Sequence, residues 1–591
     1  MSKGPVEKER LLLWMVSGWC VAIMLGALQA WALRHTLVAD SMSYLDMAYA
    51  LLRGNWRTAI NGYWSPLYPG LLCVGLWLLK PSAYWEFSVA HLVNLAIYAV
   101  TLACFQFFWS TLGDYRQREI APASKSEFMC LPDWSWLAIG YTLFLWCSLK
   151  LITVWFVTPD MCVAAAVLLA SGLLLRIRMG RASWRTSVLL GLVLGLGYLA
   201  KAVMFPMAFV FLGIAMLCGG NLRKGLQHSL TGLMVFMVVA GPFIVALSRA
   251  KGRWTYGDTG RLNYAWYANS VTRSIHWQGG QSGVGTPLHP TRKLSDTPAV
   301  YEFGTPVEGT YPPWFDPSYW YEGLRPHFDL KNQLRALWHG LHTICRVFRE
   351  FSGGLTASLL ILFLVSGRGT SAWKDIASAW PLVIPAILGL GGYAMIHVEL
   401  RYIGAFLLLF WGGLLSAVRL SDSPESRRLV AGATFAIILT IGLTAVGTTG
   451  AGLLRAIHRS DHLQWEVAQG LQQMGIRSGD SVASIGHTYG AYWAHLAQVR
   501  IVAEIPREEA ASFWAADPQR KTQIIGILAR TGAKVLVAEE GPASLAPTHW
   551  HRIGNTAYRA LVLCTPLKIS GNQASPIESP ADRKSFRAPP R

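Results

Sequence analysis

Two acidic residues stand just after the first apolar segment of the chain. Asp40 and Asp46 lie in the stretch 38–57, VADSMSYLDMAYALLRGNWR, whose pattern predicts a short amphipathic helix with Asp40 as its N-cap. A carboxylate at such a position can cap a helix, or it can take a proton from a hydroxyl group that then acts as a nucleophile. This stretch alone leaves both interpretations open.

Two further charged residues stand at the ends of other apolar runs. Asp160 belongs to the sequence VTPD, where it too could be a helix cap. Lys201 ends the glycine-rich run GLVLGLGYLAK. A lysine at a membrane edge can extend its ammonium group to lipid headgroups, or it can hold the phosphate of a lipid-linked substrate.

A polar break, HVELRY (397–402), separates two other apolar runs and contains His397, Glu399 and Arg401. Arg401 can pair with Glu399 for structural reasons, or its guanidinium group can bind a phosphate through two parallel hydrogen bonds. The sequence favours neither interpretation.

The composition shows what must position these groups. Hydrophobic residues make up 52% of the chain, charged residues only 14%, and the mean hydropathy is +0.33, which is too apolar for a soluble globular protein. The net charge of +19 gathers in short loops between apolar runs, as the positive-inside rule describes. We therefore expect a polytopic membrane protein whose electrostatic partner is the lipid bilayer rather than nucleic acid.

Apolar runs of spanning length define the predicted topology. They lie at 11–33, 87–112, 134–156, 161–175, 186–200, 202–218, 228–248, 352–366, 378–397, 402–418 and 429–449. The run 66–79 is shorter and contains two prolines, so it could be a short span or an interfacial segment. If it does not cross, the arginine-rich loops 176–185 and 419–428 share the side of the N-terminus, as the positive-inside rule requires.

We therefore predict about eleven spans with a cytoplasmic N-terminus and an external C-terminus. This topology brings Asp40, Asp160, Lys201, the long loop 249–350 and the break 397–402 to one external face. Helix capping explains each acid separately, but it does not explain why both lie on that face.

The remaining segments complete the expected domain organisation. The transmembrane domain covers 1–450, with external loops at 34–86 and 249–350. The second loop is rich in Trp and Tyr, ends in an amphipathic stretch at 330–351 and is typical of a lid or substrate-binding cover. An external α/β domain at 451–567 has predicted strands at 481–485, 499–505, 534–538 and 558–563 and predicted helices at 462–474, 489–497 and 518–529. The tail 568–591 is expected to be disordered.

Five motifs in this order resemble the C-type glycosyltransferase (GT-C) superfamily. They are DSMSYLDMAYALLRGNW, SPLYPGLL, VTPD, GLGYLAKAVMFP and ELRY, spread over 11–420. They resemble in particular the branch of protein O-mannosyltransferases and lipid A aminoarabinose transferases, similar to glycosyltransferase family 39. The resemblance implies a GT-C-like helical bundle in the bacterial inner (plasma) membrane. It also implies a sugar donor on a polyprenyl phosphate, an extracytoplasmic glycan, lipid or protein acceptor, and transfer with inversion.

The same resemblance implies roles for the polar residues. Asp40 would be the general base, while Lys201 and Arg401 would stabilise the departing lipid phosphate. Asp160 would orient the acceptor or help to bind a cation. Acceptor binding or orientation is also expected of Asp46, Tyr44, His397 and Glu399, with Asp46 taken either as structural or as acceptor-side.

One departure from the family pattern bears on cofactors. Many members have two adjacent acids after the first span, but here Asp40 is followed by Ser41. One carboxylate and one hydroxyl make a poor cage for a divalent cation, so we predict no metal ligands, although a divalent cation stays open as a cofactor. No glycine-rich phosphate loop follows a strand in 451–567, so no nucleotide site is expected there.

Two other classes of function remain as alternatives. A transporter or flippase of lipid-linked glycans would also need polar residues at membrane depth, although transporters place them within spans and show related halves. A non-catalytic protein of envelope assembly is the second alternative.

Overall fold

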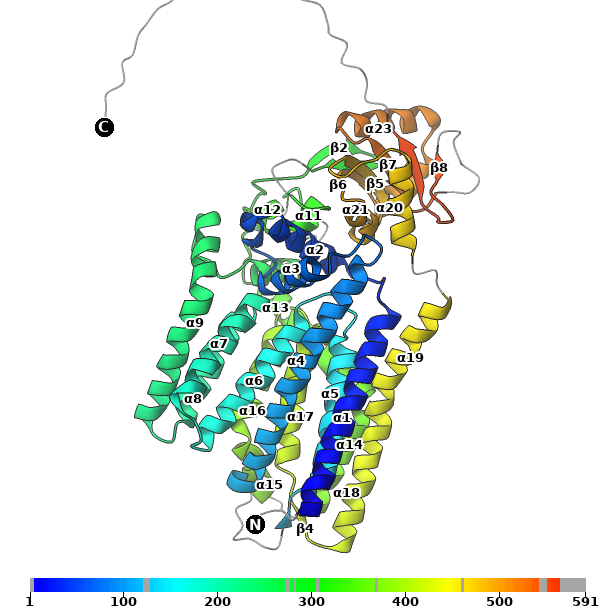
Figure 1. Ribbon diagram of the computed structural model, residues 1–591. Helices are drawn as coiled ribbons and strands as arrows, with labels where there is room; N and C mark the ends of the chain where they lie inside the picture. The colour runs from blue at the N-terminus through cyan, green and yellow to red at the C-terminus, as the bar shows by residue number, and fades with distance from the viewer. Residues whose placement is uncertain are drawn as a thin grey trace, which may run out of the picture.

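The computed structural model describes residues 5–120, 128–271, 277–280, 283–303, 308–366, 370–458, 462–541 and 550–563. A long helical bundle carries a smaller sheet domain at one end, and the start of α1 lies at the other end (Figure 1). The tail predicted to be disordered lies outside the described residues.

The helices of the bundle follow the predicted spans closely. They are α1 (Pro5–Ala32), α4 (Glu86–Tyr115), α5 (Asp133–Leu145) with η3 (Trp146–Ile152), α6 (Asp160–Arg178), α7 (Trp184–Ala200), α8 (Met204–Cys218), α9 (Leu222–Ala250), α14 (Gly353–Val365), α16 (Trp380–Ala394), α17 (Leu400–Ser416), and α18 (Pro424–Ile437) with η5 (Ile438–Gly442) and α19 (Leu443–His458). Within the described residues, six helices are long and apolar enough to cross a membrane, and two bent pairs raise the number to eight. The shorter apolar helices α7, α8 and α17 complete the bundle. The predicted fold class, a polytopic helical membrane protein, is confirmed.

Helix α3 (Leu67–Leu79) is the short apolar run whose crossing was uncertain. At about 1.5 Å per residue its 13 residues reach only about 20 Å, less than the roughly 30 Å of a bilayer core. α1 ends and α4 begins at the same end of the bundle, where α2 (Ala39–Leu52) and α3 lie together (Figure 1). The chain therefore returns to this end of the bundle without running along its length, which is consistent with the prediction that this segment does not cross.

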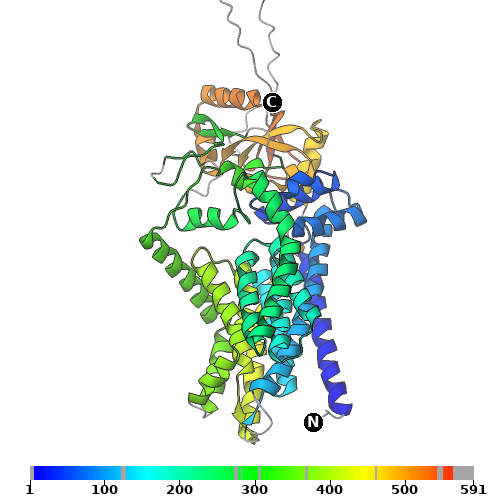
Figure 2. The ribbon, with the colours of Figure 1, turned by 90° about the vertical axis from the view of Figure 1, so that its left-hand side faces the viewer.

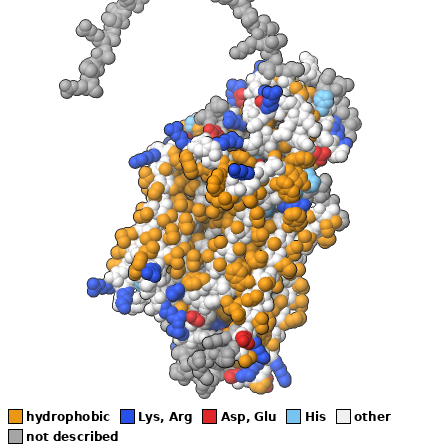
Figure 3. Space-filling view, viewed as in Figure 1, with side chains coloured by type: hydrophobic (Ala, Val, Ile, Leu, Met, Phe, Trp, Pro, Cys, Tyr) orange, Lys and Arg blue, Asp and Glu red, His pale blue; other side chains and the backbone are white. Residues whose placement is uncertain are grey.

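The basic loops gather at the end of the bundle opposite the sheet domain. Arg181, between α6 and α7, pairs with Asp114 near the end of α4 at 2.8 Å. At the same end the short strands β1 (Phe128–Met129) and β4 (Leu420–Ser421) pair with each other. Between the two ends, hydrophobic side chains cover the face of the bundle shown in Figure 3. One end of the bundle is thus basic, and the predicted site residues lie at the other.

The sheet domain is built around three parallel strands. β5 (Ser481–Gly486) lies between β6 (Arg500–Pro506) and β7 (Val535–Ala538), and the full strand order is β2-β3-β6-β5-β7-β9-β8. The four predicted strands are present within two residues of their expected ends, the last of them as β9 (Arg559–Val562), and the helices α20 (Leu463–Gln473), α21 (Tyr492–Leu496) and α23 (Pro518–Arg530) fall within the predicted ones or one residue beyond. α22 (Arg507–Ala515) and β8 (His551–Arg552) were not predicted.

The long loop 249–350 supplies part of this sheet. Its hairpin β2 (Arg292–Asp296) and β3 (Ala299–Glu302) pairs antiparallel with β6. The loop also forms α10 (Thr259–Tyr267), α11 (Pro312–Phe315), α12 (Pro317–Trp320) and α13 (Leu330–Arg346), which continues as η4 (Val347–Phe351). Viewed from the side, part of the loop lies between the bundle and the sheet, whereas β2 and β3 belong to the sheet itself (Figure 2). The loop therefore ties the sheet domain to the end of the bundle that carries the predicted site.

Candidate active site at the end of the helical bundle

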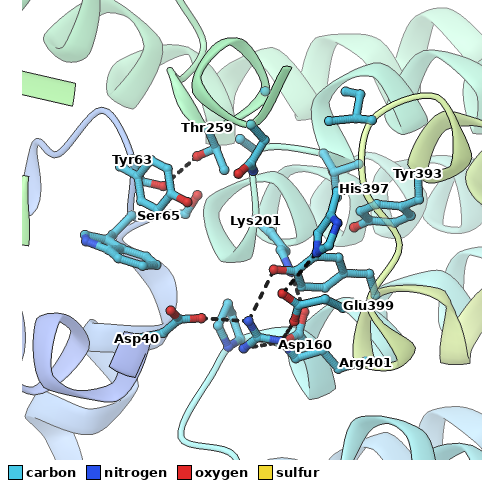
Figure 4. Close-up of a pocket in the computed structure, with 18 of the residues that line it drawn as sticks. Asp40, Tyr63, Ser65, Asp160, Lys201, Thr259, Tyr393, His397, Glu399 and Arg401 are labelled. Atoms are coloured by element: carbon cyan, nitrogen blue, oxygen red, sulfur yellow. Dashed lines mark hydrogen bonds and ion pairs between the residues drawn. The ribbon is translucent and has the colours of Figure 1, made fainter. Parts of the chain in front are cut away.

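A cavity of about 330 Å³ opens where the bundle meets the long loop, and it collects most of the predicted site residues. Asp40, Asp160, Lys201, Glu399 and Arg401 all line it, from four separate stretches of the chain (Figure 4). Each of these stretches begins or ends a helix, so short connections at one end of the bundle bring the side chains together.

Asp40 points into the cavity from the first turn of α2. The expectation that Asp40 caps this helix is wrong, because the N-cap is Val38 and its backbone N–H donates to the Ser41 hydroxyl at 3.2 Å. Ser41, which stands where many GT-C members have a second acid, is therefore used in the cap. The Asp40 carboxylate instead accepts a hydrogen bond from the guanidinium group of Arg401 at 2.7 Å.

Arg401 lies at the centre of the cavity network. Its guanidinium group contacts Asp40 at 2.7 Å, Glu399 at 2.7 Å and Asp160 at 3.6 Å. Burial by itself raises the pKa of Glu399, but the hydrogen bond from His397 and the charge of Arg401 together lower that pKa to about 2. Both interpretations of Arg401 from the sequence therefore meet here: it pairs with Glu399, and it also faces the cavity.

Lys201 and Asp160 form the second ion pair of the cavity. The Lys201 ammonium group lies 2.5 Å from a carboxylate oxygen of Asp160 and 3.6 Å from the centre of the Tyr402 ring. Asp160 is the first residue of α6, it is buried, and it also accepts a hydrogen bond from the Thr158 hydroxyl at 2.9 Å. The side-chain amide of Asn94 donates to two carbonyl groups of the segment before Thr158, which fixes the chain that leads into α6.

Aromatic rings form much of the remaining wall. His397 stacks on Tyr267 of the long loop, with ring centres 3.8 Å apart and planes within 2° of parallel. Tyr44 is buried and packs edge-on against Trp64, which also lines the cavity. Sequence reasoning missed Trp64 and the other aromatic residues of the wall, Tyr63, Tyr256, Tyr267, Trp314 and Tyr393, although the aromatic content of the loop was a signal. A cavity with polar groups at one side and rings at another suits a sugar with a charged substituent.

Asp46 is the one predicted site residue that the structure does not bring to the cavity. Its carboxylate accepts hydrogen bonds from the backbone N–H and the hydroxyl of Thr310, both at 2.7 Å, and lies 2.6 Å from Nδ1 of His495 in the sheet domain. Nε2 of His495 lies 2.5 Å from Glu86, which also accepts a hydrogen bond from the Tyr49 hydroxyl. We call Asp46, Glu86, His495, Tyr49 and Thr310 the junction cluster. Apart from Asp46 and Tyr49, which both belong to α2, its members are far apart in the sequence, and no motif marks them.

The carboxylates of the cavity do not suit a metal ion. Within the described part of the chain, no three His, Cys, Asp or Glu side chains are grouped so that they could hold a metal. Asp40, Asp160 and Glu399 are instead bound by Arg401 and Lys201. A divalent cation would have to displace those cations, so we derive no step that uses one.

Comparisons with known proteins support the fold. No protein-family model and no curated protein matches the chain. Among solved structures, ArnT, a lipid A aminoarabinose transferase, from Cupriavidus metallidurans bound to undecaprenyl phosphate is 13% identical, with a TM-score of 0.54, and the match covers 96% of this chain and 99% of ArnT. The apo oligosaccharyltransferase of Archaeoglobus fulgidus is 12% identical, with a TM-score of 0.50, and the match covers 91% of this chain and 70% of that one. The chain therefore has the GT-C fold.

Proposed function

We propose that this protein is an integral-membrane glycosyltransferase that moves a hexose or pentose from a polyprenyl phosphate to an extracytoplasmic acceptor. One observation carries the proposal: in a GT-C fold, a carboxylate that can act as a base and two cations that can hold a phosphate meet in one cavity at the membrane edge. The bound undecaprenyl phosphate in the ArnT structure supports a donor of this chemical class.

The proposed reaction is a single displacement. The acceptor hydroxyl oxygen attacks the anomeric carbon, the bond from that carbon to the phosphate oxygen breaks, and the electron pair leaves with the phosphate. Asp40 takes the hydroxyl proton, and the configuration at the anomeric carbon is inverted. Arg401 and Lys201 stabilise the negative charge that grows on the leaving phosphate, which lowers the barrier because that charge is larger in the transition state than in the ground state.

The ion pairs suggest an order of binding. Without substrate, Arg401 is shared among three carboxylates, and one of them is the proposed base. A phosphate that binds Arg401 competes with Asp40 for the same guanidinium group. Donor binding then leaves Asp40 free to face the acceptor. Asp160 and Glu399 keep Lys201 and Arg401 in position, and His397 with Tyr267 offers a flat surface to the sugar.

The distribution of charge supports a proposal for the orientation. The basic loops lie at the end of the bundle opposite the cavity, and basic loops stay in the cytoplasm. The N-terminus is then cytoplasmic, whereas the cavity and the sheet domain face outward from a bacterial inner membrane. The acceptor is a cell-envelope glycan, a lipid or a protein.

The test is the variant Asp40→Asn in nanodiscs. Undecaprenyl phosphate should still raise its melting temperature, while transfer from a lipid-linked sugar fraction should fall by about 10²–10⁴-fold, which is the usual contribution of a general base. Asp114→Asn is the matched control, since Asp114 lies at the far end of the bundle. Unchanged glycan output from Asp40→Asn would sink the assignment. Movement of the donor across sealed vesicles without transfer would favour a flippase instead.

A further inference from the structure

Helix α13 presents three different faces along its length. One face is buried: Ala336, Gly340 and Ile344 are the buried residues of the helix, and they recur every four positions. A Cβ atom added at Gly340 would lie 2.4 Å from the carbonyl oxygen of Ala394, so only glycine lets α13 cross the end of α16 this closely. The side-chain amide of Gln333 also donates to the Met395 carbonyl at 2.9 Å. α13 is therefore fixed to the bundle.

The second face is apolar and exposed. Leu330, Leu334, Trp338 and Leu341 follow one another at spacings of four, four and three residues, and Trp338 is 73% exposed. Such a row lies along one side of a helix. Exposed Cys345 continues it. An apolar row of this length on the surface marks contact with a partner or with lipid.

The third face is basic and lies about 100° around the helix from the apolar row. It consists of Lys331, Arg335, His339, His342 and Arg346, all exposed and spaced by four, four, three and four residues. Among the described residues, no acidic side chain pairs with Lys331 or Arg335, and Arg346 is 3.9 Å from its nearest carboxylate, Glu350. We call these five residues the basic row.

The position of α13 in the fold indicates which partner can contact both the apolar row and the basic row. The chain bends by 76° between the α13–η4 segment and α14, which then follows the bundle. α13 thus lies across the bundle at the same end as the cavity. Met395, which α13 contacts, also lines the cavity together with Ile396. With the bundle spanning the bilayer as proposed above, this level falls at the headgroup layer, where an amphipathic helix buries its apolar side among acyl chains and turns basic residues to phosphates.

We infer that α13 binds the anionic headgroups of bilayer phospholipids beside the mouth of the cavity. The apolar row enters the acyl-chain boundary and the basic row holds the lipid phosphates. This surface does not depend on the proposed transfer reaction. If that reaction is also right, the same row keeps anionic lipid-linked donors close to the entrance.

The experiment compares three proteins in nanodiscs of mixed phosphatidylglycerol and phosphatidylcholine. The first is the wild type, the second is Lys331→Gln/Arg335→Gln/Arg346→Gln, and the third is the control Arg477→Gln/Arg507→Gln/Arg530→Gln, which removes the same charge from exposed residues of the sheet domain. Native mass spectrometry counts the phosphatidylglycerol molecules that stay bound. Each basic residue near an anionic surface contributes about fivefold in affinity, so the α13 variant should lose at least tenfold and the control less than threefold.

A second measurement reports where the helix lies. With Cys564 and Cys20, the other exposed cysteine among the described residues, changed to Ser, a fluorophore on Cys345 should be quenched by lipids brominated near the glycerol end of their chains. If the triple variant fails to fold, Lys331→Gln and Arg335→Gln alone should each show a partial loss of bound lipid. Equal lipid retention by the α13 variant and the wild type would overturn the inference, as would an unquenched label, which would point to a protein partner.

Discussion

The junction cluster allows a sharp prediction about how the sheet domain is held. His495 is 2% exposed and lies between the side chains of Asp46 and Glu86, which are 8% and 2% exposed. The variant His495→Gln keeps the size and one hydrogen bond but removes the positive charge. Removing one partner of a buried ion pair costs about 3–5 kcal/mol, because the other charge stays buried and unpaired. Thr310 and Tyr49 still donate hydrogen bonds to the two carboxylates, so we expect the lower end of that range.

The pH dependence distinguishes this cause from a simple packing defect. Burial lowers the pKa of His495, but the charges of Glu86 and Asp46 and their hydrogen bonds outweigh it and raise the pKa from 6.5 to about 10. The folded pKa lies above the unfolded one, so the stabilisation is fully present below pH 6.5 and is lost as the pH rises through 10. At roughly 1.4 kcal/mol per pH unit, the three units from 6.5 to 9.5 correspond to about 4 kcal/mol. The difference in the free energy of unfolding between wild type and His495→Gln should therefore shrink from pH 6.5 to pH 9.5.

Hydrogen exchange of the protein in nanodiscs measures this gap locally, since α2 and α21 carry the two sides of the cluster. At pH 6.5 the variant should exchange faster in both helices, and at pH 9.5 the two proteins should approach each other. His487→Gln is the control, because His487 is an exposed histidine of the same domain. A gap that keeps its size from pH 6.5 to 9.5, or equal protection at pH 6.5, would refute the reasoning.

Three further predictions concern the cavity and α13. Arg401→Gln should weaken the binding of undecaprenyl phosphate about 10-fold or more in a thermal-shift titration, because it removes a charge-assisted hydrogen bond to the phosphate. Lys201→Gln should weaken binding to a similar extent. It should leave the ion pair between Arg401 and Asp40 intact, because Lys201 pairs with Asp160 instead. Glu399→Gln should lower stability equally at pH 5 and pH 8. The pKa of Glu399 is depressed to about 2, so its ion pair is lost only as the pH falls from about 4.5 through 2. Gly340→Ala should destabilise the docking of α13 on α16 by about 1–3 kcal/mol in limited proteolysis, whereas Gly391→Ala, which meets nothing within 4 Å, should not.

The sequence predicts the bundle well because a bilayer imposes strong constraints on it. A span must be apolar over a fixed length, and basic loops stay on one side, so hydropathy and charge define both the spans and the place of α3. The same constraints make polar residues at span ends conspicuous. Asp40, Asp160, Lys201 and Arg401 could therefore be selected from the sequence, and the structure brings all four to one cavity.

The sequence carries much less information about pairings across long distances. β2 and β3 are short and their burial shows no clear alternation, so nothing marked them as the hairpin that extends one side of a sheet formed 200 residues later. The partner of Asp46 is a histidine more than 400 positions away, in a helix of five residues. The wrong prediction that Asp40 caps α2 has a local cause. The N-cap is Val38, two residues earlier, and the Ser41 hydroxyl completes the cap in place of a carboxylate.

Asp40 and Asp46 lie on the same helix, α2, but the structure gives each of them a different partner. Asp40 meets Arg401 in the cavity, and Asp46 meets His495 of the sheet domain. Six residues of α-helix separate them by only about 9 Å along the axis, and a helix of this length moves as a rigid unit. A displacement of the sheet domain would therefore move the carboxylate of Asp40 relative to Arg401. The sheet domain, although it adds no residue to the cavity, helps to set the position of the proposed base, so loss of the junction cluster should lower transfer while the cavity keeps all its side chains.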